Sequence, residues 1–162
     1  KSNPVSELTI AQLGDIFSGK ITNWKQVGGA DANIQLYGRE SSSGTFEFFK
    51  DHVVKGDFSP RCQTLPGTAA IVNAVKKEKY SIGYGGAAYA EGVKDCKIKK
   101  DAKSAGVLPT AKTIANKTYP ISRYLYMNLK TKPTGDTKKF VDWILSSEGQ
   151  KVIESVGYYP LK

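Results

Sequence analysis

The chain has 162 residues, of which 40% are hydrophobic and 24% are charged, and its formal net charge is +9 at pH 7. This length suits one domain with a core of its own, and the composition is that of an ordinary globular protein. The sequence contains no run of about 18 apolar residues, which excludes a membrane-spanning helix.

The excess of positive charge raises the question of nucleic-acid binding. The lysines are scattered, with local density only at Lys76–Lys79 and from Lys94 to Lys103. No aromatic stacking residues alternate with them, and no zinc-ligand spacing accompanies them. We therefore expect a solvated basic face and no nucleic-acid partner, although such a surface attracts small anions at long range.

In chain order, the first predicted element is a short amphipathic helix over residues 8–19, with Thr9 as its N-cap and Gly19 as its stop signal. A strand is expected over Ile34–Tyr37. A hydroxyl- and glycine-rich turn follows this strand and leads into an aromatic-rich helix that includes Phe46 and Phe49.

The second half of the chain continues to alternate strands and helices. Helices are expected over 69–77 and 109–115, and strands over 80–86, 93–98 and 121–129. The first of these strands ends in a glycine turn, and its glycines suggest close backbone approach. The strongest helical pattern runs from Asp136 to Val156, with a break expected near Ser146–Glu148 and an end at Gly157. This alternation predicts an α/β domain with a mostly parallel or mixed sheet flanked by helices.

The most informative stretch is Gly38–Thr45, which joins a predicted strand to a helix N-terminus. The first N–H groups of a helix lack intrahelical partners and carry partial positive charge, so such a junction suits an anion. Arg39 offers a planar fork of donors for phosphate or carboxylate oxygens. Ser43 and Thr45 can donate hydroxyls, while Gly44 allows backbone to approach a ligand. The alternative is an ordinary helix cap beside a surface arginine.

The sequence gives little support to catalysis. His52 is the only histidine, and the sequence indicates no serine or cysteine nucleophile that would pair with it. Ser42-Ser43-Gly44 does not match a nucleophile elbow, no P-loop is present, and no His, Asp or Glu cluster has metal-ligand spacing. We therefore expect a protein that is not an enzyme and that has no metal or cofactor.

Several motifs, in order along nearly the whole chain, resemble the phosphate-binding proteins of ABC transporters, the PstS-like group of the type II periplasmic-binding-protein fold. They are Asn3-Pro4-Val5, Leu8-Thr9 with Gln12-Leu13, Ile16 to Trp24, Val27-Gly28-Gly29, Arg39-Glu40 with Ser43 to Phe46, Ser81 to Tyr84, Tyr119 to Arg123, Ser147 to Gln150 and Gly157 to Leu161.

The resemblance implies a role for each residue of the Arg39–Thr45 stretch. Arg39 would pair with phosphate oxygens, while the hydroxyls of Ser43 and Thr45 and the backbone N–H of Gly44 would donate to them. Some family members hold the arginine with an acidic residue two positions later. That position is Ser41 in this chain, so Glu40 is the candidate partner of Arg39.

The resemblance also implies an organisation. Residues 1–162 correspond to the second lobe and C-terminal return, a single lobe without the family's N-terminal lobe and its selective aspartate. Such a lobe would bind phosphate weakly and with little selectivity. In the full-length protein, periplasmic or extracellular and either free or lipid-anchored, two lobes would deliver phosphate to an ABC-transporter permease. The alternatives are a binding or sensor domain for another oxyanion and an anion-site phosphatase.

The two cysteines, Cys62 and Cys96, leave two possibilities open from spacing alone. They form either one disulfide or two buried thiols, and with a single histidine they do not complete an ordinary zinc site. The resemblance to an exported family favours the disulfide.

Overall fold

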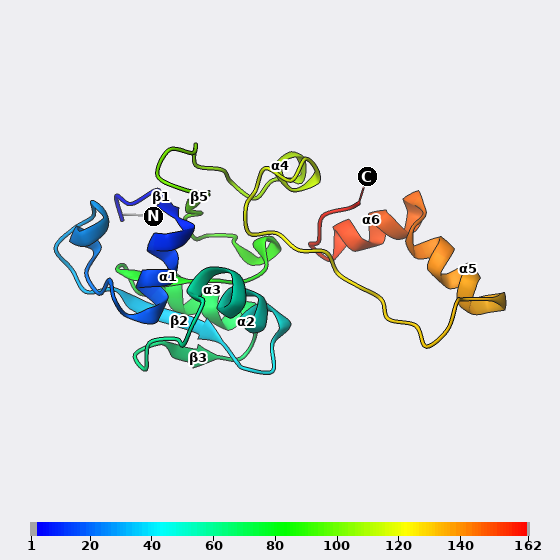
Figure 1. Cartoon of the computed structure of the whole chain (residues 1–162), viewed down its shortest axis with the longest axis horizontal. Coiled ribbons are helices and arrows are strands. Elements are labelled where there is room, and N and C mark those ends of the chain that lie inside the picture. Colours follow the sequence, from blue (N-terminus) through cyan, green and yellow to red (C-terminus); the bar gives the residue numbers. More distant parts are fainter. Residues whose placement is uncertain (1–2, 162) are drawn as a thin grey trace.

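The computed structural model describes residues 3–161 and contains two small parallel sheets (Figure 1). The three-stranded sheet has the order β3-β2-β4, and its strands are β2 (Gln35–Arg39), β3 (Gln63–Leu65) and β4 (Ser81–Gly83). The two-stranded sheet pairs β1 (Glu7–Thr9) with β5 (Lys97–Lys99). All of these pairings are parallel.

Helices and helical turns connect these strands. They are α1 (Ile10–Ser18), η1 (Trp24–Val27), α2 (Gly44–Phe49) with its π-helical continuation η2 (Lys50–Val54), α3 (Gly67–Lys77), η3 (Ala87–Tyr89), α4 (Ala111–Ala115), α5 (Gly135–Ile144) and α6 (Ser147–Ser155). The expected α/β class, with a mostly parallel sheet flanked by helices, is confirmed.

The first helix shows why the local predictions succeed. The Thr9 hydroxyl accepts the Gln12 N–H, and the Gln12 side chain accepts the Thr9 N–H, which completes a capping box. Gly19 ends the helix with φ = 85°, a left-handed conformation that favours glycine. Both predicted ends of this helix are therefore confirmed.

The core lies where α1 packs against η2 and the sheets. Leu8, Ile16 and Phe17 are fully buried, and Phe17 makes edge-to-face contacts with Phe49 and Tyr84. The indole N–H of Trp24 donates to the carbonyl of Tyr80 over 2.9 Å, which ties the η1 turn to the start of β4. This packing holds the carboxyl ends of β2 and β4 in place.

Residues 3–121, which we call the body, contrast with residues 122–161, which we call the C-terminal arm. Figure 1 shows α5 and α6 set apart from the body at the end of an extended connection. The end of the arm returns to the body, where the Tyr159 hydroxyl donates to the Pro109 carbonyl over 2.7 Å.

Several predictions outside the anion stretch need correction. The strand expected over 121–129 does not form, because this extended segment has no neighbouring strand within residues 3–161. The strand expected over 93–98 is shorter and displaced to Lys97–Lys99, and the helix expected from Pro109 begins at Ala111 after the Thr110 cap. The break in the last helix is confirmed, because Ser146 caps α6 and accepts the Gly149 N–H.

Within residues 3–161, no helix has both the length and the apolar character required to cross a membrane.

Candidate functional site

Arg39 is the last residue of β2, and the chain turns there toward α2. Its position is fixed by parallel pairing with β3, in which Arg39 lies opposite Leu65. Its backbone N–H donates to the Tyr84 hydroxyl over 3.2 Å, so the residue that follows β4 also supports it. The carboxyl edge of a parallel sheet is the usual place for a ligand in an open α/β fold, and Arg39 lies at this edge.

The guanidinium of Arg39 is held by two neighbours. Its Nε and Nη2 donate to the two carboxylate oxygens of Glu40, each over 3.0 Å, and its Nη1 donates to Thr68 Oγ1 over 3.2 Å. A guanidinium has five N–H donors, so one on Nη1 and one on Nη2 are left by these contacts. The side chain is only 16% exposed, which limits its freedom to leave this orientation.

Glu40 connects Arg39 to the start of α3, because its Oε2 also accepts the Gly67 N–H over 3.2 Å. The hydrogen bond from Arg39 lowers the pKa of the Glu40 carboxyl to about 2, with smaller help from backbone N–H groups. The same hydrogen bond raises the pKa of Arg39. Glu40 is therefore ionised near neutral pH, and it offsets most of the charge of Arg39 locally.

The residues that follow form the start of α2. Ser43 is 7% exposed and caps the helix, with its Oγ accepting from Thr45 N over 3.2 Å and from Phe46 N over 3.4 Å. Within residues 3–161, neither the Gly44 N–H nor the Thr45 hydroxyl has a hydrogen-bond partner. A Ser43 hydroxyl that accepts at its oxygen still has its own proton to donate.

The structure thus places all four predicted ligands, Arg39, Ser43, Gly44 and Thr45, along one continuous segment, which we call the anion loop (residues 39–45). An arginine fork, hydroxyls and helix-start N–H groups suit a small oxyanion with several acceptor oxygens. Glu40 occupies the place of arginine partner that the sequence suggested for it.

Residues far from the anion loop in sequence also support it, and no sequence pattern identifies them directly. Thr68 and Tyr84 lie 29 and 45 positions from Arg39, and both touch it. A Cβ built at Gly85 would clash with Thr68 Cγ2, so this glycine allows the segment after β4 to pack on Thr68. The glycines after β4 were the available signal, and the close approach expected there is confirmed.

Arg123, at the base of the C-terminal arm, is a further residue beside the anion loop. A Cβ built at Gly44 would lie 3.5 Å from its Nη2. The Tyr119–Arg123 motif pointed to this region but gave Arg123 no role.

The two cysteines are free thiols, so the expected disulfide is corrected. Cys62 precedes β3 at one edge of the three-stranded sheet, with Sγ close to Gly38, whereas Cys96 precedes β5 in the other sheet. Burial raises the pKa of each thiol to about 11, which keeps both protonated and unreactive near neutral pH.

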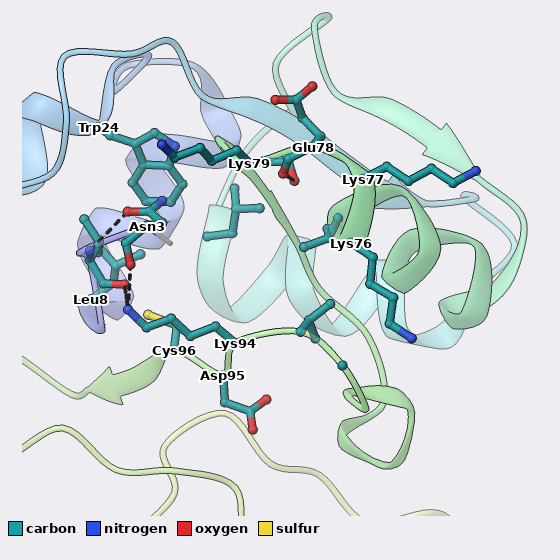
Figure 2. A pocket seen from close by; sticks show the side chains of 16 residues that line it. Asn3, Leu8, Trp24, Lys76, Lys77, Glu78, Lys79, Lys94, Asp95 and Cys96 are labelled. Atoms are coloured by element: carbon teal, nitrogen blue, oxygen red, sulfur yellow. Dashed lines mark hydrogen bonds between the residues drawn. The ribbon is translucent and has the colours of Figure 1, made fainter. Parts of the chain in front are cut away.

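A separate cavity of about 240 Å³ lies near the amino end of β4 (Figure 2). Because β2 and β4 are parallel, this cavity and Arg39 lie at opposite ends of the sheet. In Figure 2, Lys94 reaches toward Asn3, and its Nζ donates to the carbonyls of Asn3 and Val5 over 2.7 and 2.9 Å. Glu78 and Asp95 line the same cavity, so its charge is mixed and does not single out a ligand.

Comparison with known proteins decides the family. A model of the PBP superfamily domain matches residues 1–148. The chain belongs to this family. Its relatives include the phosphate-binding protein PstS of Pseudomonas aeruginosa, which is 34% identical over 179 residues that cover 99% of this chain and 55% of the relative. The PstS of Staphylococcus epidermidis is 40% identical over 164 residues, which cover 95% of this chain and 49% of the relative.

Solved structures of this family agree with the fold. A putative phosphate ABC transporter substrate-binding protein from Clostridium perfringens, with bound phosphate, matches with a TM-score of 0.80 and 34% identity, over 99% of this chain and 65% of that one. An ABC-type phosphate transport receptor from Vibrio cholerae matches with a TM-score of 0.77 and 30% identity. The match covers 98% of this chain and 66% of the receptor.

The resemblance to phosphate-binding proteins is therefore confirmed, and the family is one of substrate-binding proteins, not enzymes. The chain spans about half the length of the curated relatives it matches.

Proposed function

We propose that this chain is one substrate-binding lobe, residues 1–162, which binds inorganic phosphate through Arg39, Ser43, Gly44 and Thr45. The observation that carries the proposal is the way in which the Arg39 guanidinium is held. Glu40 and Thr68 hold its guanidinium with three hydrogen bonds, which leaves two N–H donors. Five positions later, the Gly44 N–H and the Thr45 hydroxyl at the start of α2 are free within residues 3–161. Pre-positioned donors reduce the entropy cost of binding a small anion.

In the full-length protein this lobe would form one side of a two-lobed binding site that closes on phosphate by hinge motion. The exposed apolar residues of the C-terminal arm would then pack against the second lobe. The closed protein, periplasmic or extracellular and either free or lipid-anchored, would deliver phosphate to an ABC-transporter permease. We propose a binding role without catalysis, because the carboxylate of the anion loop, Glu40, is already engaged by Arg39 and the Gly67 N–H.

Isothermal titration of the chain with phosphate, and separately with sulfate, tests the proposal. We expect weak, saturable binding of both anions, because the loop offers donors and no free carboxylate to accept a proton from phosphate. Arg39→Ala should weaken phosphate binding by at least about tenfold, since charged hydrogen bonds are the strong ones.

The matched control is Arg61→Gln, which removes an exposed arginine at the amino end of β3, away from the carboxyl edge that holds Arg39. It should leave the affinity within about twofold, because a distant exposed charge acts only through screened, long-range attraction. An Arg39→Ala variant that binds phosphate as well as the parent chain would overturn the proposal. Submicromolar binding that resists sulfate would overturn its expectation of low selectivity.

A further inference from the structure

We propose that Arg123 is a second cationic ligand of the anion bound at the anion loop, an inference that rests on the proposed function. Its side chain approaches the loop from the base of the C-terminal arm, 79 positions from Gly44 in sequence. The site would then be formed by two segments, the β2–α2 junction and the start of the arm.

The geometry places the whole guanidinium of Arg123 along Gly44. A Cβ built at Gly44 would lie 3.5 Å from Nη2, 3.7 Å from Nη1 and 4.0 Å from Cζ. The same group lies over the Phe48 ring, with Cζ 5.8 Å from the ring centroid, so α2 supports it from the side. Arg123 therefore lies beside the first turn of α2, where the Gly44 N–H and the Thr45 hydroxyl are free within residues 3–161.

The charges favour a ligand role for Arg123. Arg39 forms an ion pair with Glu40 at 3.0 Å, so the pair contributes little net charge. Arg123 is exposed, and within the part of the chain that the structure describes no carboxylate lies within 4.0 Å of it. Arg123 therefore places uncompensated positive charge beside the loop. An oxyanion there would receive directed donors from Arg39 and both donors and charge from Arg123.

The glycine at position 44 is part of the same arrangement. Its conformation is helical and its built Cβ meets the arginine at an ordinary contact distance, so alanine fits without a clash. The added methyl group would nevertheless occupy space between the loop and the Arg123 guanidinium. Gly44→Ala should therefore weaken anion binding without loss of stability, because alanine is the better helix former.

The experiment is a phosphate titration of the whole chain by calorimetry, combined with NMR of the arginine Nε–H signals. The variants are Arg39→Ala, Arg123→Gln, Arg123→Lys and Gly44→Ala, with Arg61→Gln as the matched control. We expect Arg123→Gln to raise the Kd about tenfold, and Arg123→Lys to raise it less because it keeps the charge but loses the fork. The Arg123 Nε–H signal should move along the same saturation curve as the calorimetric heat.

The outcomes separate the two claims. If Arg39→Ala weakens binding while Arg123→Gln stays within twofold of the parent chain and the Arg123 signal is unmoved, the role of Arg123 is overturned and the phosphate site stands. If Arg39→Ala leaves the affinity unchanged, the proposed function fails instead. If the parent chain shows no saturable response to phosphate, both fail. A purely structural role on Phe48 would change stability and leave the Kd and the Nε–H signal alone.

Discussion

Phe17 in the body and Trp143 in the C-terminal arm are both aromatic residues on amphipathic helices, yet their surroundings differ. Phe17 is fully buried on α1, whereas Trp143 on α5 is 42% exposed and, within residues 3–161, stacks only on Phe140 of the same helix. The same difference in burial holds for the body and the arm as a whole, because many apolar side chains of α5 and α6 are exposed to solvent. An amphipathic pattern thus predicts a face that is suited to burial without saying what buries it.

Truncation of the two aromatic residues should give the largest difference in stability between the body and the C-terminal arm. Phe17→Ala should lower the free energy of unfolding by about 3–5 kcal/mol, because it removes a buried ring from a close-packed core. Trp143→Ala should lower it by less than about 1 kcal/mol, because that side chain is already in contact with solvent. Urea denaturation followed by far-ultraviolet circular dichroism measures both values. Equal losses would show that the arm is packed as tightly as the body.

Two serine N-caps, one in the body and one in the arm, allow the same comparison with a smaller expected change in stability. Ser43 caps α2 in the body, and Ser146 caps α6 in the arm. Ser43→Ala should cost about 1 kcal/mol of global stability, since an N-cap serine satisfies helix N–H groups that otherwise lose their partner.

Ser146→Ala should fray α6 locally and leave the global transition close to that of the parent chain, because α6 packs little against the body. Hydrogen exchange of the α2 and α6 amides, read together with the urea midpoints, separates a global effect from a local one. A global loss from Ser146→Ala as large as that from Ser43→Ala would contradict the division into body and arm.

The smallest expected effects concern two ion pairs. The Glu40 carboxyl has its pKa lowered from 4.5 to about 2 by Arg39, so its stabilising contribution is present above pH 4.5. That contribution is lost as the pH falls through about 2. Glu40→Gln should therefore reduce the urea midpoint at pH 7 and converge with the parent chain toward pH 2.

The control in the arm is Asp142→Asn, which breaks an exposed pair with Lys138 at i,i+4 on α5. Exposed pairs of this kind contribute only about 0.3–0.5 kcal/mol, so little change is expected at pH 7. Urea midpoints at pH 7, 4.5 and 3 provide the measurement. A Glu40→Gln deficit that stays constant across this range would show that Glu40 acts through packing and not through its charge.

Local signals in the sequence predicted the local parts of the fold. The Thr9 cap, the Gly19 stop and the Ser146 break depend on residues within a few positions of one another, and each is confirmed. The strand expected over 121–129 is wrong because alternation describes side chains and does not supply a neighbouring strand. The disulfide expectation failed for a similar reason, because Cys62 and Cys96 precede strands of different sheets.

The same distinction holds at the anion loop. Arg39, Glu40, Ser43, Gly44 and Thr45 are consecutive or nearly so, and the sequence identified them together. Thr68 and Tyr84 come from elements that only the folded sheet brings to Arg39, and Arg123 comes from the base of the arm. Sequence patterns therefore predicted an anion ligand, while the tertiary structure supplied the residues that contact Arg39 and Gly44.

The most direct test of the phosphate site is a titration of the 15N-labelled chain with inorganic phosphate, observed at its backbone amides. Saturable shifts concentrated at Gly44 and Thr45, and absent in Arg39→Ala, are the predicted result. Shifts spread over the scattered surface lysines, or an equal response in Arg39→Ala, would contradict a site at the anion loop.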